Sequence, residues 1–199
     1  MLQAESIQRI LPGVFRWEIF SAEHKVALCS HAIVVSGRLI CFDPVPLADA
    51  PFDELSRQGG PSAIVLTNEN HERDCALWRD SWRVPIWADA TASLTIAGVQ
   101  RFERHQSQWQ DWQLHRLVGG AGGEIALQQP SDSLVVCGDA IVNLPTRGLE
   151  LLPDKYCRDP ASLRNSLRKL VSQPFDRLML AHGTSVLENA SDRVAALLG

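Results

Sequence analysis

The sequence predicts one domain of mixed strands and helices, in the α/β (α+β) class. Residues 14–42 consist of short apolar segments with period-two alternation, which is typical of adjacent antiparallel strands. From residue 52 onward, helical patterns alternate with short apolar runs, as in layered α/β proteins. No internal repeat or low-complexity linker interrupts the chain, and 199 residues suit one domain with a substantial core. We therefore expect residues 1–199 to form a single domain.

The first third of the chain is expected to form a meander of antiparallel strands. Residues 14–20 alternate between apolar and polar side chains, as in a half-buried strand. Two apolar runs follow within residues 26–35, and a turn at Ser36-Gly37 leads into a further strand at 38–42. Because short turns join neighbouring antiparallel strands, this order predicts that consecutive strands pair with one another.

Helices and strands alternate in the rest of the chain. The helix that begins at Pro160 is well marked, because Asp159 can cap its N-terminus and proline suits the first helical position. A glycine-rich turn at 119–123 joins two strands, whereas residues 90–110 have no clear pattern. Further helices are expected at 52–57, 74–82 and 186–198, and strands at 63–66, 84–87, 112–118, 124–128, 133–137 and 177–181.

The composition limits the partners and the cellular compartment. The net charge is -4 and there is no basic run, so we expect no nucleic-acid partner. The apolar runs are far shorter than the ~20 residues of a membrane span, so we expect no membrane insertion. The N-terminus lacks an apolar signal region, and the 5 cysteines are scattered without a C-x-x-C pair. These features predict a cytoplasmic protein with free thiols, and they leave its oligomeric state open.

Polar side chains follow three of the apolar strands, at the point where each strand ends. Thr67-Asn68 follows Leu66, Gly138-Asp139 follows Cys137, and His182-Gly183 follows Ala181. Each of these pairs alone would more often be a turn or a helix cap. Three such strand ends in one chain favour a shared site, because groups at strand ends converge on a crevice at one edge of layered sheets.

The order of these motifs resembles the metallo-β-lactamase fold superfamily, from about Val14 to Leu198. That superfamily has a T-H-x-H-x-D-H signature after a strand, and the segment Thr67-Asn68-Glu69-Asn70-His71-Glu72-Arg73 falls on it. Its P-G-H-T-x-G turn corresponds to residues 119–123, its G-D motif to Gly138-Asp139, and its G-H-G motif to residues 181–183. The resemblance implies a four-layer αββα sandwich and a metal-dependent hydrolase.

The same resemblance implies a degenerate metal site that has lost its dinuclear zinc centre. Only Asp139 and His182 keep the residue types of the family. The other ligand positions hold Asn68, Asn70 and Gly120 for the first metal, and Glu72 and Arg73 for the second. An asparagine oxygen suits hard cations better than zinc, and the guanidinium of arginine stays protonated and cannot bind a metal.

Three hypotheses follow from this pattern. In the first, the fixed charge of Arg73 replaces a metal as the positive partner of Asp139, and the pocket holds no cofactor. In the second, one divalent ion (zinc, iron or manganese) is bound by Glu72, Asp139 and His182, with help from His71 or an asparagine oxygen, and a small ester or thioester is hydrolysed. A metal-free variant uses His182 or His71 as general base and Arg73 to stabilise an oxyanion.

The third hypothesis is a protein without catalytic activity, which binds a small anion in a pocket centred on Arg73. His71 bears on all three hypotheses, because it occupies a position of the signature that should face away from the metals. We expect it to hydrogen-bond a nearby loop; the alternative is that a local backbone change turns it inward to join His182. Lys155 and Tyr156 are expected to lie near the mouth of the pocket, in a structural loop.

Overall fold

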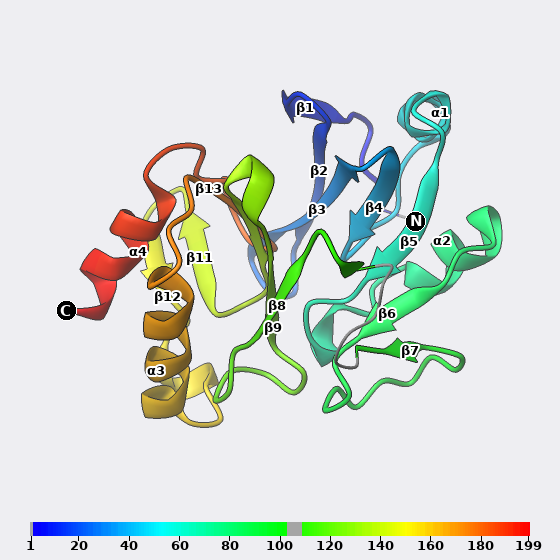
Figure 1. Ribbon diagram of the computed structural model, residues 1–199. Helices are drawn as coiled ribbons and strands as arrows, with labels where there is room; N and C mark the ends of the chain where they lie inside the picture. Colours follow the sequence, from blue (N-terminus) through cyan, green and yellow to red (C-terminus); the bar gives the residue numbers. More distant parts are fainter. Residues whose placement is uncertain (1, 103–108) are drawn as a thin grey trace.

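Two β-sheets packed face to face form the centre of the protein in the computed structural model, which describes residues 2–102 and 109–199 (Figure 1). One sheet has seven strands in the order β1 to β7, and the other has four in the order β13-β10-β9-β8. The segment 90–110, for which the sequence indicated no element, lies partly outside the described residues.

The seven-stranded sheet begins with the predicted antiparallel meander and continues with parallel strands. Consecutive strands from β1 to β4 pair antiparallel, and β5, β6 and β7 are added in parallel. The two apolar runs within 26–35 belong to one continuous strand, because both pair with β2. The bounds are β1 (Gln8–Leu11), β2 (Val14–Ser21), β3 (Val26–Val35), β4 (Arg38–Phe42), β5 (Pro61–Val65), β6 (Ile86–Ala88) and β7 (Gln100–Arg101).

The second sheet contains the remaining predicted strands. Strands β8 (Gln113–Arg116), β9 (Ile125–Gln129) and β10 (Leu134–Cys137) pair antiparallel, and β13 (Arg177–Leu180) joins β10 in parallel. A two-stranded hairpin, β11 (Ile141–Leu144) with β12 (Gly148–Leu151), follows β10. This hairpin was not predicted from the sequence.

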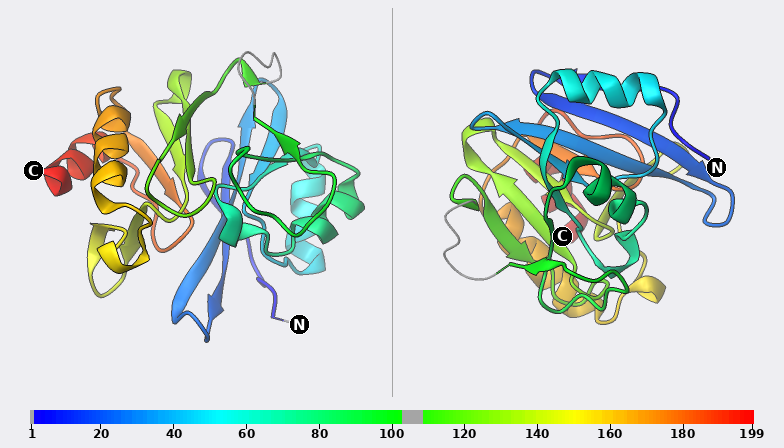
Figure 2. Two further views of the ribbon diagram at one scale, coloured as in Figure 1. Left: turned by 90° about the horizontal axis from the view of Figure 1, so that it is seen from below. Right: turned by 90° about the vertical axis from the view of Figure 1, so that its right-hand side faces the viewer.

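Helices cover both outer faces of the sandwich (Figures 1 and 2). Helices α1 (Asp49–Arg57) and α2 (Cys75–Trp82) pack on the seven-stranded sheet, and α3 (Pro160–Val171) and α4 (Ala190–Leu198) pack on the four-stranded sheet. The predicted αββα arrangement is confirmed. Helix α4 begins four residues later than predicted, because Val186 exchanges backbone hydrogen bonds of 2.7 and 2.9 Å with Leu178 instead.

Successive side chains along a strand point to opposite faces of the sheet, and this alternation separates the apolar core into three layers. In β10, Leu134 and Val136 point between the sheets, whereas Val135 and Cys137 lie under α3 and α4. Burying each such aliphatic side chain stabilises the fold by roughly 1.5–3 kcal/mol. A shift of the register by one residue would move the side chains of each core into the other core, and it is strongly disfavoured. This fixed register determines where the polar residues after each strand lie.

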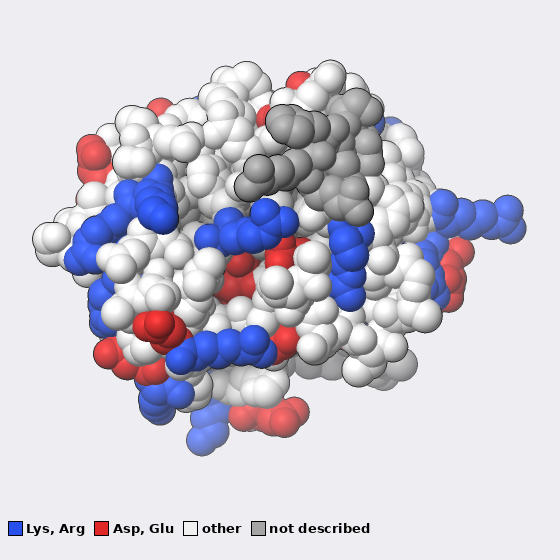
Figure 3. Space-filling view, turned by 60° about the horizontal axis from the view of Figure 1, so that its bottom comes forward, with Lys and Arg blue, Asp and Glu red and all other residues white. Residues whose placement is uncertain are grey.

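The surface charge and the state of the cysteines agree with what the composition predicted. Among the described residues, no helix is long and apolar enough to cross a membrane. All five cysteines are free, as expected, and Cys157 is the one that is not buried. On the face drawn in Figure 3, basic side chains surround a small hollow that contains acidic ones, so this face is not uniformly basic.

Candidate functional site

The polar strand ends of both sheets meet at one place. The chain leaves β5 through Thr67 and Asn68 into the short 3-10 helix η1 (Glu69–His71), and it leaves β10 and β13 through Asp139 and His182. The Asn68 side chain caps η1, because its Oδ1 accepts a hydrogen bond of 2.8 Å from the Asn70 amide. This local turn buries His71 to 3% exposure and directs its ring toward the second sheet.

His71, Asp139 and His182 form a compact cluster. The Nε2 atoms of His71 and His182 lie 3.1 and 3.0 Å from Asp139 Oδ1, and the two ring centroids are 5.6 Å apart. One ligand atom from each side chain lies within 4.8 Å of the other two, and this is the one such group found in the described part of the chain. His71 therefore lies beside His182, as in the alternative, and through Nδ1 it also contacts the loop residues Thr67 and Asp43, as expected.

The other ring nitrogens are already engaged. His71 Nδ1 lies 3.0 Å from Asp43 Oδ2 and 2.9 Å from Thr67 Oγ1, and His182 Nδ1 lies 2.9 Å from the carbonyl oxygen of Ala27. A carboxylate and a carbonyl only accept hydrogen bonds, so Nδ1 carries the proton in both neutral rings. The lone pair of each Nε2 then points to Asp139.

This arrangement requires a cation between the three side chains. Asp139 Oδ1 is buried and forms no hydrogen bond of good geometry, although two imidazole nitrogens are close to it. Two lone pairs and a carboxylate oxygen repel one another unless protons or a metal ion lie among them. Two imidazoles and one carboxylate are a ligand set of catalytic zinc and of non-haem iron(II) sites, so the residues fit a divalent ion.

Charges around the cluster shift its protonation. Burial lowers the pKa of His71, but Asp139 and Asp43 outweigh this effect and raise it to about 9. Burial likewise opposes ionisation of Asp139, yet the charge of His71 and the imidazole nitrogens of His182 and His71 close to Oδ1 hold its pKa well below the usual range. The pKa of Asp43 is also lowered despite burial, because His71 and Arg73 lie beside it. Without a metal ion, a proton on His71 therefore supplies the cation.

Arg73 does not pair with Asp139 as the first hypothesis expected. Its Nη1 donates to the carbonyl oxygens of Cys29 (2.7 Å) and Asp43 (2.8 Å), and its Nη2 approaches that of Ala181 at 3.5 Å. The backbone of Arg73 is left-handed, with φ at 42°, which costs a non-glycine residue of order 1 kcal/mol and is compensated by these contacts. Arg73 thus connects β3 with the residues that follow β4 and β13 rather than neutralising the acid.

Three further positions suggested by the resemblance lie outside the cluster. Glu72 accepts hydrogen bonds from the backbone amide and the hydroxyl of Thr95, so its carboxylate is not available as a ligand. Asn70 is exposed, and only its backbone amide contributes to the site. At Gly120, a Cβ would lie 2.8 Å from Glu124 Cγ, which leaves no room for a ligating side chain. In this structure, neither Glu72 nor Asn70, both predicted as metal ligands, is placed with His71, Asp139 and His182.

Asn68 belongs to the site, but as a donor. Its Nδ2 donates to Glu124 Oε2 at 2.8 Å and to Asp139 Oδ2 at 3.1 Å. Glu124, which sequence reasoning missed, is 3% exposed, and its Oε1 accepts from the Ala140 amide at 3.0 Å. Burial and the nearby Asp139 raise the pKa of Glu124 to about 8. Its position between a glycine-rich turn and the buried strand β9 was the available signal.

Asp43 is the second missed residue. It is 2% exposed and accepts from the backbone amide of Thr67 at 2.8 Å and from its hydroxyl at 2.6 Å. It follows β4 directly, and Asp139 and His182 lie two residues after β10 and β13, so the same signal could have found it. Lys155 and Tyr156 lie in the 3-10 helix η4 (Asp154–Tyr156), where the ammonium group is 4.7 Å from the ring centroid.

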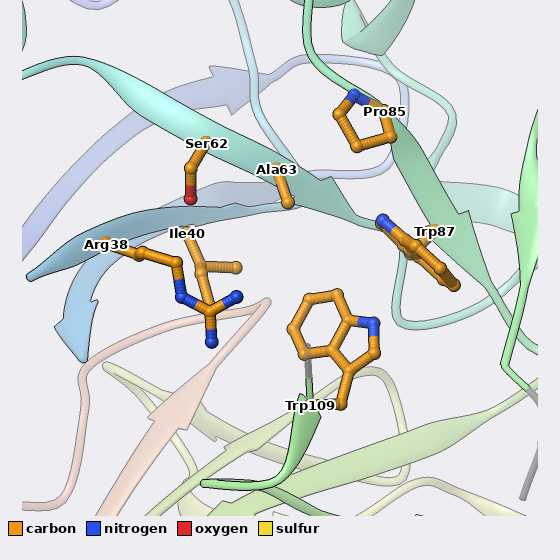
Figure 4. Close-up of a pocket in the computed structure, with 7 residues that line it drawn as sticks. All are labelled: Arg38, Ile40, Ser62, Ala63, Pro85, Trp87 and Trp109. Carbon is orange, nitrogen blue, oxygen red and sulfur yellow. The ribbon is translucent and has the colours of Figure 1, made fainter. Parts of the chain in front are cut away.

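A separate cavity of about 130 Å³ shares no residue with this cluster. It lies between strands β4 to β6 and Trp109, and Trp87 and Trp109 face it from two sides (Figure 4). Its described lining contains no histidine, cysteine or carboxylate. The cluster of His71, Asp139 and His182 is therefore the better candidate for chemistry.

Comparison with known proteins agrees with this architecture. The family described as the metallo-beta-lactamase superfamily matches residues 5–199. Among solved structures, a metallo-beta-lactamase from Erythrobacter litoralis with beta-mercaptoethanol in its active site is 13% identical, with a TM-score of 0.73 over 96% of this chain and 95% of that chain. FIM-1 from Pseudomonas aeruginosa, in its mono-zinc form, is 13% identical with a TM-score of 0.73 and covers 99% and 95%.

A metallo-beta-lactamase from Pontibacter korlensis is similar as well, with 13% identity and a TM-score of 0.69 over 98% of this chain and 99% of that chain. At these identities, the structural likeness concerns the fold alone. No curated protein matches the sequence at a significant level.

Proposed function

Because the chain belongs to the metallo-beta-lactamase superfamily, we propose that it is a hydrolase with one divalent metal ion held by His71, Asp139 and His182. The observation that carries this proposal is the convergence of three ligand atoms while both Nδ1 atoms are engaged elsewhere. Hydrogen bonds from the second nitrogen of a ligating imidazole to a carboxylate or carbonyl are typical of metal sites. The mono-zinc form of FIM-1 supports a single ion on this fold.

The role proposed for each residue follows from its hydrogen bonds in the site. A bound divalent ion would act as a Lewis acid and lower the pKa of a water molecule to near neutrality. His71 and His182 would hold it through Nε2, with Asp43 and the Ala27 carbonyl orienting their rings. Asp139 would bind through Oδ1, while Asn68 fixes its Oδ2 at 3.1 Å.

A small ester or thioester is the proposed substrate class. The side chains of Asp139 and His182 are each 15% exposed, whereas that of His71 is 4% exposed. A substrate would therefore approach from the side of Asp139 and His182. Hydrolysis of a panel of aryl esters and acyl thioesters, with and without added metal, would test this class; turnover that is unaffected by His182→Ala would contradict it.

Metal content tests the proposal directly. In protein purified without chelators, we expect about one zinc, iron or manganese ion per chain, and a large loss of this ion in His71→Ala and His182→Ala. His24→Ala is the matched control, because His24 is an exposed imidazole outside the cluster. A metal-free wild type that stays metal-free after dialysis against Zn²⁺ would overturn the proposal and favour the cofactor-free hypothesis.

The alternative of an anion-binding protein centred on Arg73 has weaker support. The guanidinium already donates to two backbone carbonyls and approaches a third, which leaves little hydrogen-bonding capacity for a ligand. The five free cysteines support the proposal of a reducing, cytoplasmic location.

A further inference from the structure

The Asn68 amide lies between two buried carboxyl groups beside the proposed metal site. Its Nδ2 is 2.8 Å from Glu124 Oε2 and 3.1 Å from Asp139 Oδ2. Asn68 is fully buried and Glu124 is 3% exposed. One N–H of the amide is therefore available for each carboxyl group, and neither group has a cationic side chain as its partner in this contact.

The orientation of the amide is fixed from both ends. Asn68 Oδ1 accepts a hydrogen bond of 2.8 Å from the Asn70 amide, so the NH₂ group must face the acids. The surroundings are tightly packed, because a Cβ on Gly138 would lie 2.6 Å from Glu124 Oε1, 2.7 Å from Thr67 Oγ1 and 3.1 Å from Asn68 Nδ2. Glycine at position 138 allows this close approach.

These contacts have a consequence for metal stoichiometry. An ion that bound Glu124 and Asp139 together would have to occupy the space of the Asn68 NH₂ group. An amide nitrogen donates hydrogen bonds and offers no lone pair to a metal, so it cannot be shared with such an ion. We propose that the Asn68 amide, held in place by Asn70 and Glu124, substitutes for a second cation and restricts the site to one metal ion.

The inference rests on the proposed one-metal function and assigns Asn68 and Glu124 as positioning residues. Asn68 acts through Asp139: by holding Oδ2, it leaves Oδ1 directed at the two imidazoles. The same interaction supplies positive partial charge to both acids without a second ion. Replacing the donor by an acceptor should therefore create a second, oxygen-rich cation site, which suits Mn²⁺.

Two metals that mass spectrometry distinguishes provide the test. The metal-free protein is loaded with one equivalent of Zn²⁺ and then dialysed against excess Mn²⁺. We expect one zinc and no manganese in the wild type, but one zinc and one manganese in Asn68→Asp. Asn70→Asp is the matched control, because the same chemical change is made at an exposed side chain, and it should behave as the wild type.

The outcomes separate this inference from the proposed function. Manganese in the zinc-loaded wild type, or none in a folded Asn68→Asp protein, would overturn the inference and leave the one-metal proposal intact. Failure of the wild type to bind zinc would overturn both. If Asn68→Asp does not fold, Asn68→Ser takes its place: loss of the amide should admit manganese, and adding Glu124→Gln should abolish that uptake. The absence of manganese from folded Asn68→Ser would equally overturn the inference.

Discussion

His71 joins the cluster because of its position at the end of η1, a 3-10 turn that is separated from β5 by residues 66–68. The sequence shows a histidine in a place that should face outward, and the polar context allows both orientations. The decision depends on the Asn68 cap and on Asp43, which come from different parts of the chain. Single-residue alignment to a signature cannot include these contacts, and this explains why Glu72 and Asn70 were preferred as ligands.

The protonation of His71 predicts how metal affinity varies with pH. A metal ion must displace the proton on His71, whose pKa is raised to about 9. Below that value, the apparent affinity for Zn²⁺ should rise about tenfold per pH unit, and above it the rise should level off. Competition with a chromophoric chelator between pH 7 and 8.5 would measure this dependence.

Measurements above pH 7.5 provide the control for that experiment. An ordinary histidine, with a pKa near 6.5, is already deprotonated at pH 7.5 and would contribute almost no pH dependence above it. A constant zinc affinity between pH 7.5 and 8.5, after correction for buffer and hydroxide complexes, would contradict the protonated state of His71.

At the scale of elements, a helix was predicted correctly where the sequence contained both an N-cap residue and a proline at the first helical position. Asp159 and Pro160 predicted the start of α3, and Asp159 Oδ1 does accept from the Ser162 amide at 3.0 Å. The hairpin of β11 and β12 has strands of only 4 residues each and forms a separate sheet. Its stability depends on Leu149 and Leu151 packing against the outer core, which no local pattern indicates.

The N-cap of α3 provides a prediction at this scale. Asp159→Ala removes the side-chain acceptor, so it should destabilise the protein and lower the midpoint of urea unfolding. Asp159→Asn should retain most of the stability, because asparagine caps helices about as well as aspartate. Equal losses in the two variants would mean that the capping hydrogen bond is not the cause.

At the scale of the whole molecule, the site connects the two sheets. His71 follows β5 of the seven-stranded sheet, whereas Asp139 and His182 follow β10 and β13 of the four-stranded sheet. Arg73 also connects the two sheets, because its guanidinium contacts Cys29 of β3 and Ala181 after β13. An ion in the cluster would therefore cross-link both halves of the sandwich.

Metal binding should accordingly stabilise the entire fold. At free Zn²⁺ one hundred times the Kd, the native state gains about 2.7 kcal/mol, which corresponds to an increase in Tm on the order of 5–10 °C for a chain of this size. Thermal unfolding with Zn²⁺ and with a chelator would measure the difference. His182→Ala should lose most of it; an unchanged difference in that variant would place the stabilising ion elsewhere.

The sequence by itself determined the order of most elements and the strand ends that carry polar groups, and the resemblance carried by its motifs implied the αββα class. These features follow from local periodicity and from motifs short enough to be seen along the chain. Only the tertiary structure decided that His71 rather than Glu72 faces His182, that Arg73 binds backbone carbonyls, and that Asn68 bridges Asp139 and Glu124. The physical reason is that each side chain takes its orientation from hydrogen-bond partners on other elements, some of them more than 50 residues away along the chain, as the Asn68–Glu124 contact illustrates with a separation of 56 residues.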